Sequence, residues 1–224
     1  MSTTSRLSRR VAPREVLPDL AEEFKAMIVK SIRWAWAEVS QRWPELVASG
    51  DEESISASLA DLLNEQDTDG GRRAPGLSSF ETIQRGGKVQ GADGCIEYQP
   101  DLVFRPYSMP PLVRNRSSWG WFVECKLVDG ARLERHYCRN GVQRFVEGRY
   151  AARMPSGAML GYARDGREPY TCLKPLLSGR YGNSTVEQPD ASTSSQIRSR
   201  HERLATTPIE LTHLWLQASS TAPG

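Results

Sequence analysis

The hydrophobic pattern of this chain changes from a helical period to a strand-like one near residue 77, and this change limits the possible folds most. Residues 19–43 carry apolar side chains at three- and four-residue steps, which predicts a long amphipathic helix with a broad aromatic stripe. A shorter helix is predicted over residues 52–64, with Asp51 as its N-cap. We expect an α/β fold in which helices flank a central sheet.

Short runs of β-branched and aromatic residues predict strands in the middle of the chain, over residues 80–85, 95–105 and 121–128. Residues 66–77 and 178–195 are rich in Gly, Pro, Ser and Asp without an apolar period, so we expect surface loops there. The later elements expected are a helix over residues 131–152, bent near residue 140, and strands over residues 158–163 and 209–217.

One main domain is expected, because 224 residues with 38% hydrophobic content supply a single sizeable core. Residues 1–18 are rich in Ser, Thr and Arg without an apolar period, which predicts a disordered basic arm. The other parts expected are an N-terminal helical extension over residues 19–45, the α/β domain over residues 46–217 and a disordered tail over residues 218–224.

Composition narrows the setting of the protein but not its activity. The four cysteines include no CxxC pair, and neither a membrane-length apolar run nor the apolar core of a signal peptide is present. These features predict a cytoplasmic protein with reduced thiols and no membrane partner. The formal net charge is only +2, so any affinity for nucleic acid must come from a local basic patch.

Two charged residues, Glu124 and Lys126, interrupt the apolar run of residues 121–128. They are two positions apart on a predicted strand, so both side chains leave the same face, where charge is costly without a partner. Asp101 begins an earlier predicted strand and would approach Glu124 if the two strands pair as a hairpin. Two adjacent carboxylates need a cation between them, and hard oxygen ligands suit Mg²⁺ or Mn²⁺. Lys126 would then hold the attacking water or the phosphoryl oxygens.

The dipeptide Pro100-Asp101 followed by the tripeptide Glu124-Cys125-Lys126 resembles the PD-(D/E)XK motif of the restriction-endonuclease-like nuclease superfamily. This resemblance implies an αβββαβ core in which a mixed central sheet is flanked by helices. It also implies Mg²⁺-dependent cleavage of DNA, with Asp101 and Glu124 as metal ligands and Lys126 as the catalytic lysine.

The resemblance covers residues 52–161 in the order of the expected elements. Many members of the superfamily also carry a glutamate on the first core helix, which implies Glu52 as a further metal ligand and catalytic residue, with Glu53 in reserve. Either acid is equally typical of a first helical turn, where the helix dipole favours negative charge. Some members place Gln and Tyr four residues apart on the helix after the lysine strand, whereas Gln143 and Tyr150 are seven apart.

Basic residues after the apolar strand suggest a surface for nucleic acid. Arg139, Arg144 and Arg149 recur on the predicted helix, with Arg153 beyond them, and would follow a phosphate backbone; a salt-bridged surface is the alternative. His201 would orient a scissile phosphate or assist a leaving group, unless it lies on a solvated helix end or loop. The last histidine, at position 213, alternates with apolar residues and is expected to be a hydrogen-bonded core residue.

Together these patterns lead to the hypothesis of a metal-dependent endonuclease acting on double-stranded DNA, with antiviral defence as its setting by analogy alone. One alternative is a nuclease fold that has lost catalysis and binds DNA or a protein. Another is an interaction protein whose Trp-rich helix over residues 19–43 docks a partner or a second copy of the chain. In that case Glu124 and Lys126 would form a structural ion pair.

Overall fold

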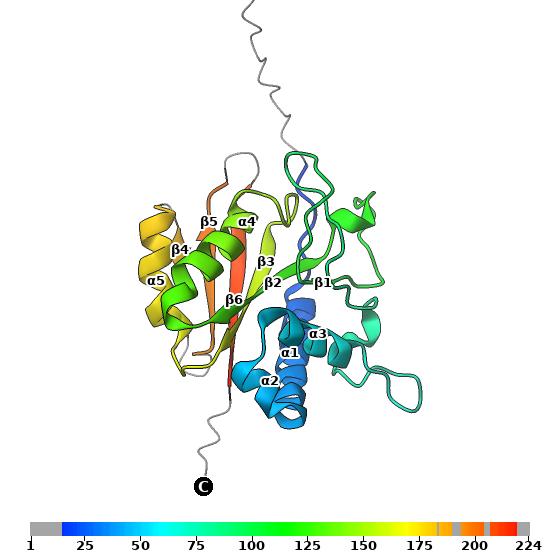
Figure 1. Ribbon diagram of the computed structural model, residues 1–224. Helices are drawn as coiled ribbons and strands as arrows, with labels where there is room; N and C mark the ends of the chain where they lie inside the picture. The colour runs from blue at the N-terminus through cyan, green and yellow to red at the C-terminus, as the bar shows by residue number, and fades with distance from the viewer. Residues whose placement is uncertain (1–14, 183, 190–193, 204–206, 219–224) are drawn as a thin grey trace, which may run out of the picture.

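A mixed sheet forms the centre of the computed structural model, which describes residues 15–182, 184–189, 194–203 and 207–218. Within these residues the sheet has six strands in the order β1-β2-β3-β6-β5-β4. Helices flank it (Figure 1), which confirms the expected α/β class. The strands are β1 (Leu102–Phe104), β2 (Trp121–Val128), β3 (Ser156–Ala163), β4 (Thr185–Val186), β5 (Gln196–His201) and β6 (Ile209–Gln217).

The helices form two groups (Figure 1). The first group, α1 to α3, precedes the sheet in sequence. The second group lies on the other side of the sheet and consists of a π-helix with its α-helical continuation, which joins β2 to β3, and of α5, which contacts the π-helix. None of the described helices is long and apolar enough to cross a membrane. The helices are α1 (Glu22–Arg42), α2 (Pro44–Ser49), α3 (Glu52–Asn64), α4 (Gln143–Val146) and α5 (Pro169–Arg180), the π-helix η4 (Leu133–Val142) and the 3₁₀ turns η1 (Leu77–Ser79), η2 (Arg116–Ser118) and η3 (Gly130–Arg132).

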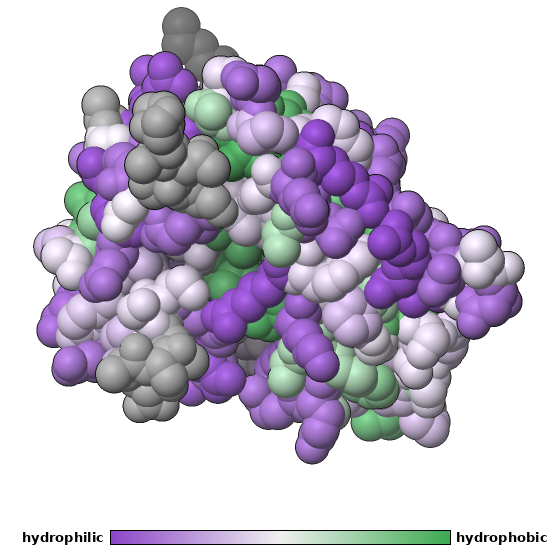
Figure 2. All heavy atoms as spheres, turned by 90° about the horizontal axis from the view of Figure 1, so that it is seen from below, coloured by the Kyte–Doolittle hydropathy of each residue, from purple (hydrophilic) through white to green (hydrophobic). Residues whose placement is uncertain are grey.

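The strands β2, β3 and β6 run parallel and form the buried centre of the sheet. All eight residues of β3 are buried, as expected for a parallel strand covered by helices on both faces. The outer pairs β1–β2, β6–β5 and β5–β4 are antiparallel. Seen from the carboxyl ends of β3 and β6, the surface is mainly hydrophilic, with a hydrophobic hollow near its middle (Figure 2).

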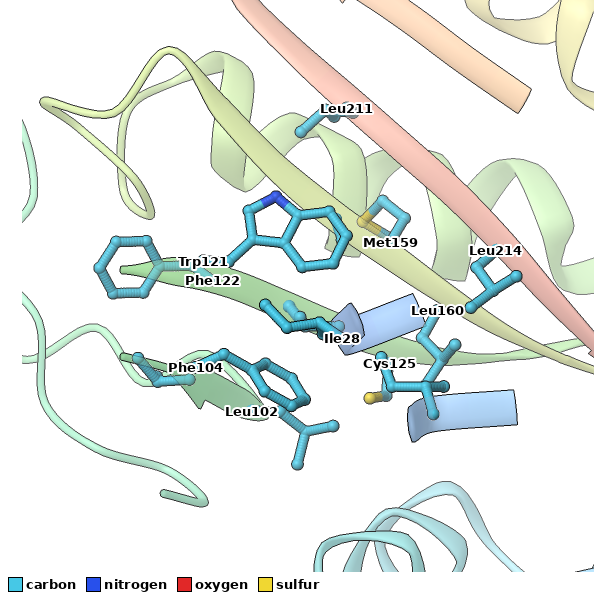
Figure 3. Packing of buried hydrophobic residues seen from close by; sticks show 14 of the residues in the cluster. Ile28, Leu102, Phe104, Trp121, Phe122, Cys125, Met159, Leu160, Leu211 and Leu214 are labelled. Carbon is cyan, nitrogen blue, oxygen red and sulfur yellow. The ribbon is translucent and has the colours of Figure 1, made fainter. Parts of the chain in front are cut away.

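Helix α1 belongs to the same hydrophobic core as the sheet. Ile28 and Ile32 are buried, and Ile28 lies among side chains of β1 and β2 (Figure 3). Trp36 stacks on Tyr162 of β3 with ring centroids 5.6 Å apart. The apolar stripe that was considered as a docking surface therefore faces the protein's own sheet, although Trp43 beyond the helix is 41% exposed.

The two chain ends are described only in part. The arm expected over residues 1–18 falls mostly on residues 1–14, which lie outside the described residues, as do residues 219–224 of the expected tail. The remainder of the arm differs from the expectation. Leu17 is buried in the core and its backbone N–H donates to the carbonyl of Arg153 at 2.8 Å. The expected disorder is therefore wrong for this residue, because an apolar side chain anchors it.

The strands expected over residues 80–85 and 95–105 are much shorter in the structure. Residues 80–85 make isolated bridges, between Phe80 and Pro106 and between Gln84 and Val103. Residues 95–105 contain β1 and an isolated bridge between Tyr98 and Val89. Asn64 explains part of this difference. Its side chain accepts the N–H of Ile83 at 2.7 Å and donates to its carbonyl at 3.0 Å, so a helix end takes the bonds that a neighbouring strand would make.

The loop expected over residues 178–195 contains the end of α5 and all of β4, and β5 follows it directly. Neither α5 nor β5 was predicted from the sequence. Helix α5 has Pro175 inside it, and β5 consists largely of polar residues. Pairing with β6 fixes β5 as a strand, so a tertiary contact outweighs its local composition.

Candidate active site

The edge of β2 becomes open halfway along the strand because β1 is so short. β1 pairs with β2 only as far as Val123. Beyond that point the N–H of Cys125 donates to Asp101 Oδ2 at 2.7 Å, and the N–H of Leu127 donates to Glu52 Oε2 at 3.0 Å. Buried backbone donors must be satisfied. Two carboxylates therefore occupy the place of the missing strand.

The antiparallel register brings Asp101 next to Glu124. Leu102 pairs with Val123, so the preceding residue Asp101 lies opposite Glu124. This neighbourhood is the geometric condition on which the sequence-based hypothesis depended, and the structure meets it.

Lys126 lies among three carboxylates. Its Nζ is 2.7 Å from Glu52 Oε1, 2.9 Å from Glu124 Oε1 and 3.8 Å from Asp101 Oδ2. It also donates to the carbonyl of Cys125 at 2.6 Å. The four residues expected to be catalytic thus converge from α3, β2 and the residue before β1.

Burial makes these charges strongly interdependent. Glu124 is fully buried, and burial together with the nearby Asp101 raises its pKa to about 7. Burial, opposed by Lys126, also raises the pKa of Asp101. For Lys126, burial alone would lower the pKa, but Glu124, Asp101 and Glu52 outweigh it and hold the pKa above the ordinary value. Lys126 is therefore an ammonium ion at neutral pH.

A second cation, Arg144, binds the same glutamate. Its Nη1 donates to Glu124 Oε1 at 2.7 Å and to the hydroxyl of Tyr150 at 2.7 Å. The Tyr150 hydroxyl in turn donates to the carbonyl of Gln99 at 3.0 Å. Arg144 was expected from the sequence to contact the DNA backbone, whereas the structure places both Arg144 and Tyr150 at the site. Gln143 instead donates to Glu147 at 2.5 Å.

The other arginines expected to follow DNA lie on the surface. Arg139 is 3.2 Å from Glu134, and Arg149 is 2.8 Å from Glu147. About half of each arginine side chain is exposed, so these ion pairs contribute little to stability and would open easily for a phosphate. Their contact with nucleic acid stays a prediction.

His201 is not an exposed phosphate ligand, and the expectation is wrong in this respect. The residue is fully buried on β5, where its ring nitrogens bond the hydroxyls of Ser184 at 2.8 Å and Ser199 at 2.7 Å. The Ser199 hydroxyl is also 2.7 Å from His213 Nε2. His213 bonds the Tyr137 hydroxyl at 3.0 Å through its other nitrogen, which confirms it as a hydrogen-bonded core residue.

These buried histidines should make the protein sensitive to acid. Burial lowers the pKa of His201 to about 4, and burial with the neighbouring His201 lowers that of His213 to about 3, from an ordinary 6.5. The unfolded chain then binds more protons than the folded one below about pH 6.5, where the slope for two groups approaches about 2.7 kcal/mol per pH unit. The two histidines make their full contribution to the free energy of unfolding above about pH 6.5, and this contribution is lost progressively as the pH falls toward 4. Urea unfolding between pH 7.5 and 4.5 measures the slope, which should be smaller in His201→Gln; an equal slope would contradict the assignment.

A cleft of about 530 Å³ opens beside the converging carboxylates. Glu52, Asp101, Gln99 and Arg85 are among its lining residues. Solvent and a polar ligand can therefore approach the open edge of β2 from the side of α3.

The fit of this site to a metal ion depends on two carboxylates. Among the described residues, Glu124 Oε2 is buried without a hydrogen-bond partner, and repulsion by Asp101 contributes to the raised pKa of Glu124. Both observations match the hard oxygen ligands of a divalent cation. Both oxygens of Glu52 are already bonded, to Lys126 and to the backbone of Leu127. In the described parts of the chain, no group of three or more His, Cys, Asp or Glu residues is placed to hold a metal.

Comparison with known proteins yields no relative of this chain: no family model, no curated protein and no solved structure matches it. The function must therefore be inferred from the positions and chemistry of the side chains. Asp101, Glu124 and Lys126 provide the strongest observation, since the buried Glu124 and Lys126 meet the half-buried Asp101 at the edge of a cleft.

Proposed function

We propose that this protein is a metal-dependent endonuclease that hydrolyses phosphodiester bonds in double-stranded DNA. The observation that carries the proposal is the meeting of Asp101, Glu124 and Lys126 at the open edge of β2. The order of α3, the strand-like residues 80–85, β1, β2, the η4–α4 segment and β3 also agrees with the αβββαβ core of the resemblance. Defence against foreign DNA is proposed by analogy with that superfamily.

Asp101 and Glu124 are the residues that would hold Mg²⁺ or Mn²⁺. When bound, such an ion supplies a Lewis acid that activates water and neutralises charge on the phosphate. Glu124 Oε2, which has no hydrogen-bond partner within the described ranges, would be available as a ligand for the ion. Glu52 acts on the neighbouring groups instead, by holding the ammonium of Lys126 and the backbone of Leu127.

Lys126 provides a fixed positive charge beside the reacting phosphate. Glu52 Oε1 and the carbonyl of Cys125 restrain its Nζ from two directions. A charge held in place before the reaction stabilises the transition state without reorganisation, which is the largest contribution in many enzymes. Lys126 would therefore stabilise the negative charge that develops on the phosphoryl oxygens.

The charge of the site accounts for a requirement for metal. When all five groups are ionised, the carboxylates of Glu52, Asp101 and Glu124 exceed the cations Lys126 and Arg144 by one negative charge. A phosphate is therefore repelled until a divalent cation is added. Because the pKa of Glu124 is about 7, binding of the cation should also release protons near neutral pH.

Replacing Asp101 by asparagine tests the proposal. The amide oxygen can still accept the N–H of Cys125, but the charge is lost, so we expect at least about a 100-fold loss of plasmid cleavage in Mg²⁺ or Mn²⁺. Calorimetric titration with Mn²⁺ should show weaker binding in the same variant. Cleavage of single-stranded DNA and of RNA, measured in parallel, defines the substrate class.

Asp61→Asn is the matched control, because Asp61 is exposed on α3, away from β2. This control should cleave and bind Mn²⁺ as the unchanged protein does, and EDTA should stop cleavage in both. Equal cleavage by Asp101→Asn would refute the assigned role of Asp101. If the unchanged protein binds DNA but neither binds Mn²⁺ nor cleaves the DNA, the result would instead support the non-catalytic alternative.

A further inference from the structure

A second cavity, of about 310 Å³, lies on the other face of the sheet from the carboxylates. Trp121 lines it from β2, and successive residues of a strand point to opposite faces, so Trp121 and Glu124 project to different sides. Thr212 of β6 and Arg198 of β5 form the rest of the floor, and α1 forms the wall. This cavity is thus separate from the proposed nuclease site.

The lining of the cavity is strongly basic. Two of its cations are already paired: Lys25 lies 2.6 Å from Asp19, and Arg198 lies 3.0 Å from Glu22. Glu22 is the acidic residue in the lining, against four basic ones. The basic residues that line the cavity are Lys25, Lys30, Arg33 and Arg198.

Lys30 and Arg33 have positive charges that no carboxylate neutralises among the residues described. They are three positions apart on α1, so both side chains lie on the side of the helix that borders the cavity. Among the described residues, Arg33 makes two long contacts, each of 3.4 Å, in which it donates to the Ser195 hydroxyl and to the side-chain amide oxygen of Gln196. Two exposed cations are therefore available to an anion at the mouth of the cavity.

Trp121 adds an unused hydrogen-bond donor. The residue is 1% exposed, and its indole Nε1 is buried with no hydrogen-bond partner in the part of the chain that the structure describes. Figure 3 shows this nitrogen on the edge of the ring turned toward β3 and β6, away from Phe104. Buried indole N–H groups nearly always find an acceptor, so a donor left free beside a cavity indicates a ligand that supplies one.

We propose that this cavity binds a small phosphorylated ligand. Lys30 and Arg33 would bind its phosphate oxygens, and the Trp121 N–H would donate to an oxygen of the same ligand. Ala26 and Val29 would contact the less polar part of a mononucleotide. The cavity volume lies at the lower end of the range for small-molecule sites. The ligand is either inorganic phosphate or a mononucleotide, which share this chemistry. The site does not depend on the proposed nuclease activity.

Calorimetric titration of the full chain with inorganic phosphate and, separately, with AMP tests the site. We expect saturable binding that is at least about tenfold weaker in Lys30→Gln and in Arg33→Gln, because each loses one charge-assisted hydrogen bond. Both residues are exposed, so the variants should fold, and thermal melting checks this. Lys174→Gln on α5 is the matched control and should bind as the unchanged protein does.

Trp121→Phe tests the buried donor, since it keeps an aromatic ring and removes the N–H. Weaker binding by a variant that still melts cooperatively supports the site, and unchanged binding contradicts it. AMP binding tighter than phosphate identifies a nucleotide site, and equal affinity identifies a phosphate site. Absence of saturable binding to both probes overturns the proposal, and so does binding by Lys30→Gln and Arg33→Gln that equals that of the unchanged protein.

Discussion

Replacing Lys126 by glutamine should lower the rate of metal-dependent DNA cleavage by about 10²–10³-fold, the usual effect of removing one fixed group that stabilises transition-state charge. The glutamine side chain is neutral and cannot stabilise the negative charge that develops on the phosphate. Single-turnover cleavage at saturating Mg²⁺ separates this loss from weaker DNA binding. Lys174→Gln, an exposed lysine on α5, should leave the rate unchanged.

The same substitution should also destabilise the fold, by an amount that depends on pH. Removing one partner from a buried ion pair typically costs about 3–5 kcal/mol, because the other charge stays buried. Here Glu124, whose pKa is already about 7, can take up a proton and so reduce the cost. The folded variant then binds more protons than the unfolded chain, so its stability should fall as pH rises from 6 to 8.

Urea unfolding of Lys126→Gln at pH 6 and pH 8 measures this difference. Where the variant is too unstable at pH 8, activity and stability can both be measured at pH 6. A folded variant with the cleavage rate of the unchanged protein would remove Lys126 from the mechanism. The structural ion-pair alternative predicts that result together with a loss of stability.

Deleting α1 should unfold the whole domain, because this helix belongs to the hydrophobic core. We expect a chain that lacks residues 15–43 to show no cooperative unfolding transition by circular dichroism. The point substitution Ile28→Ala should cost about 2–5 kcal/mol, the range for truncating a fully buried aliphatic side chain. Urea unfolding measures this cost.

Glu23→Ala is the control within the same helix. Glu23 is exposed, so its substitution should change stability by no more than about 0.5 kcal/mol. A truncated chain that still unfolds cooperatively would show that α1 is a separable extension, as sequence analysis expected. The same result would revive the hypothesis that its aromatic stripe docks a partner.

The meeting of Asp101, Glu124 and Lys126 could be anticipated because it depends on local rules. Alternation along β2 places Glu124 and Lys126 on one face, and a hairpin-like pairing brings the preceding strand alongside. Glu52 was selected because the resemblance implies a glutamate on the first core helix, but its contact with the backbone of Leu127 was not expected. That contact exists because β1 ends early and leaves a donor to be satisfied.

The residues that were misjudged depend on contacts distant in sequence. Arg144 was expected to face solvent because it belongs to a row of arginines, yet it lies 2.7 Å from Glu124 Oε1, which is buried in another element. His201 was expected near a phosphate because its neighbours are polar. Pairing of β5 with β6 turns alternate residues inward and buries it.

The sequence by itself determined the α/β class, the span of β2 and the charged residues on that strand, because hydrophobic period and side-chain alternation are properties of neighbouring residues. Three features could be learned only from the three-dimensional arrangement: β1 stops short, Arg144 shares Glu124 with Lys126, and α1 completes the core. These features arise from burial and from the pairing of backbone donors between segments far apart in the chain. A pattern of neighbouring residues does not show which distant segments will pack together.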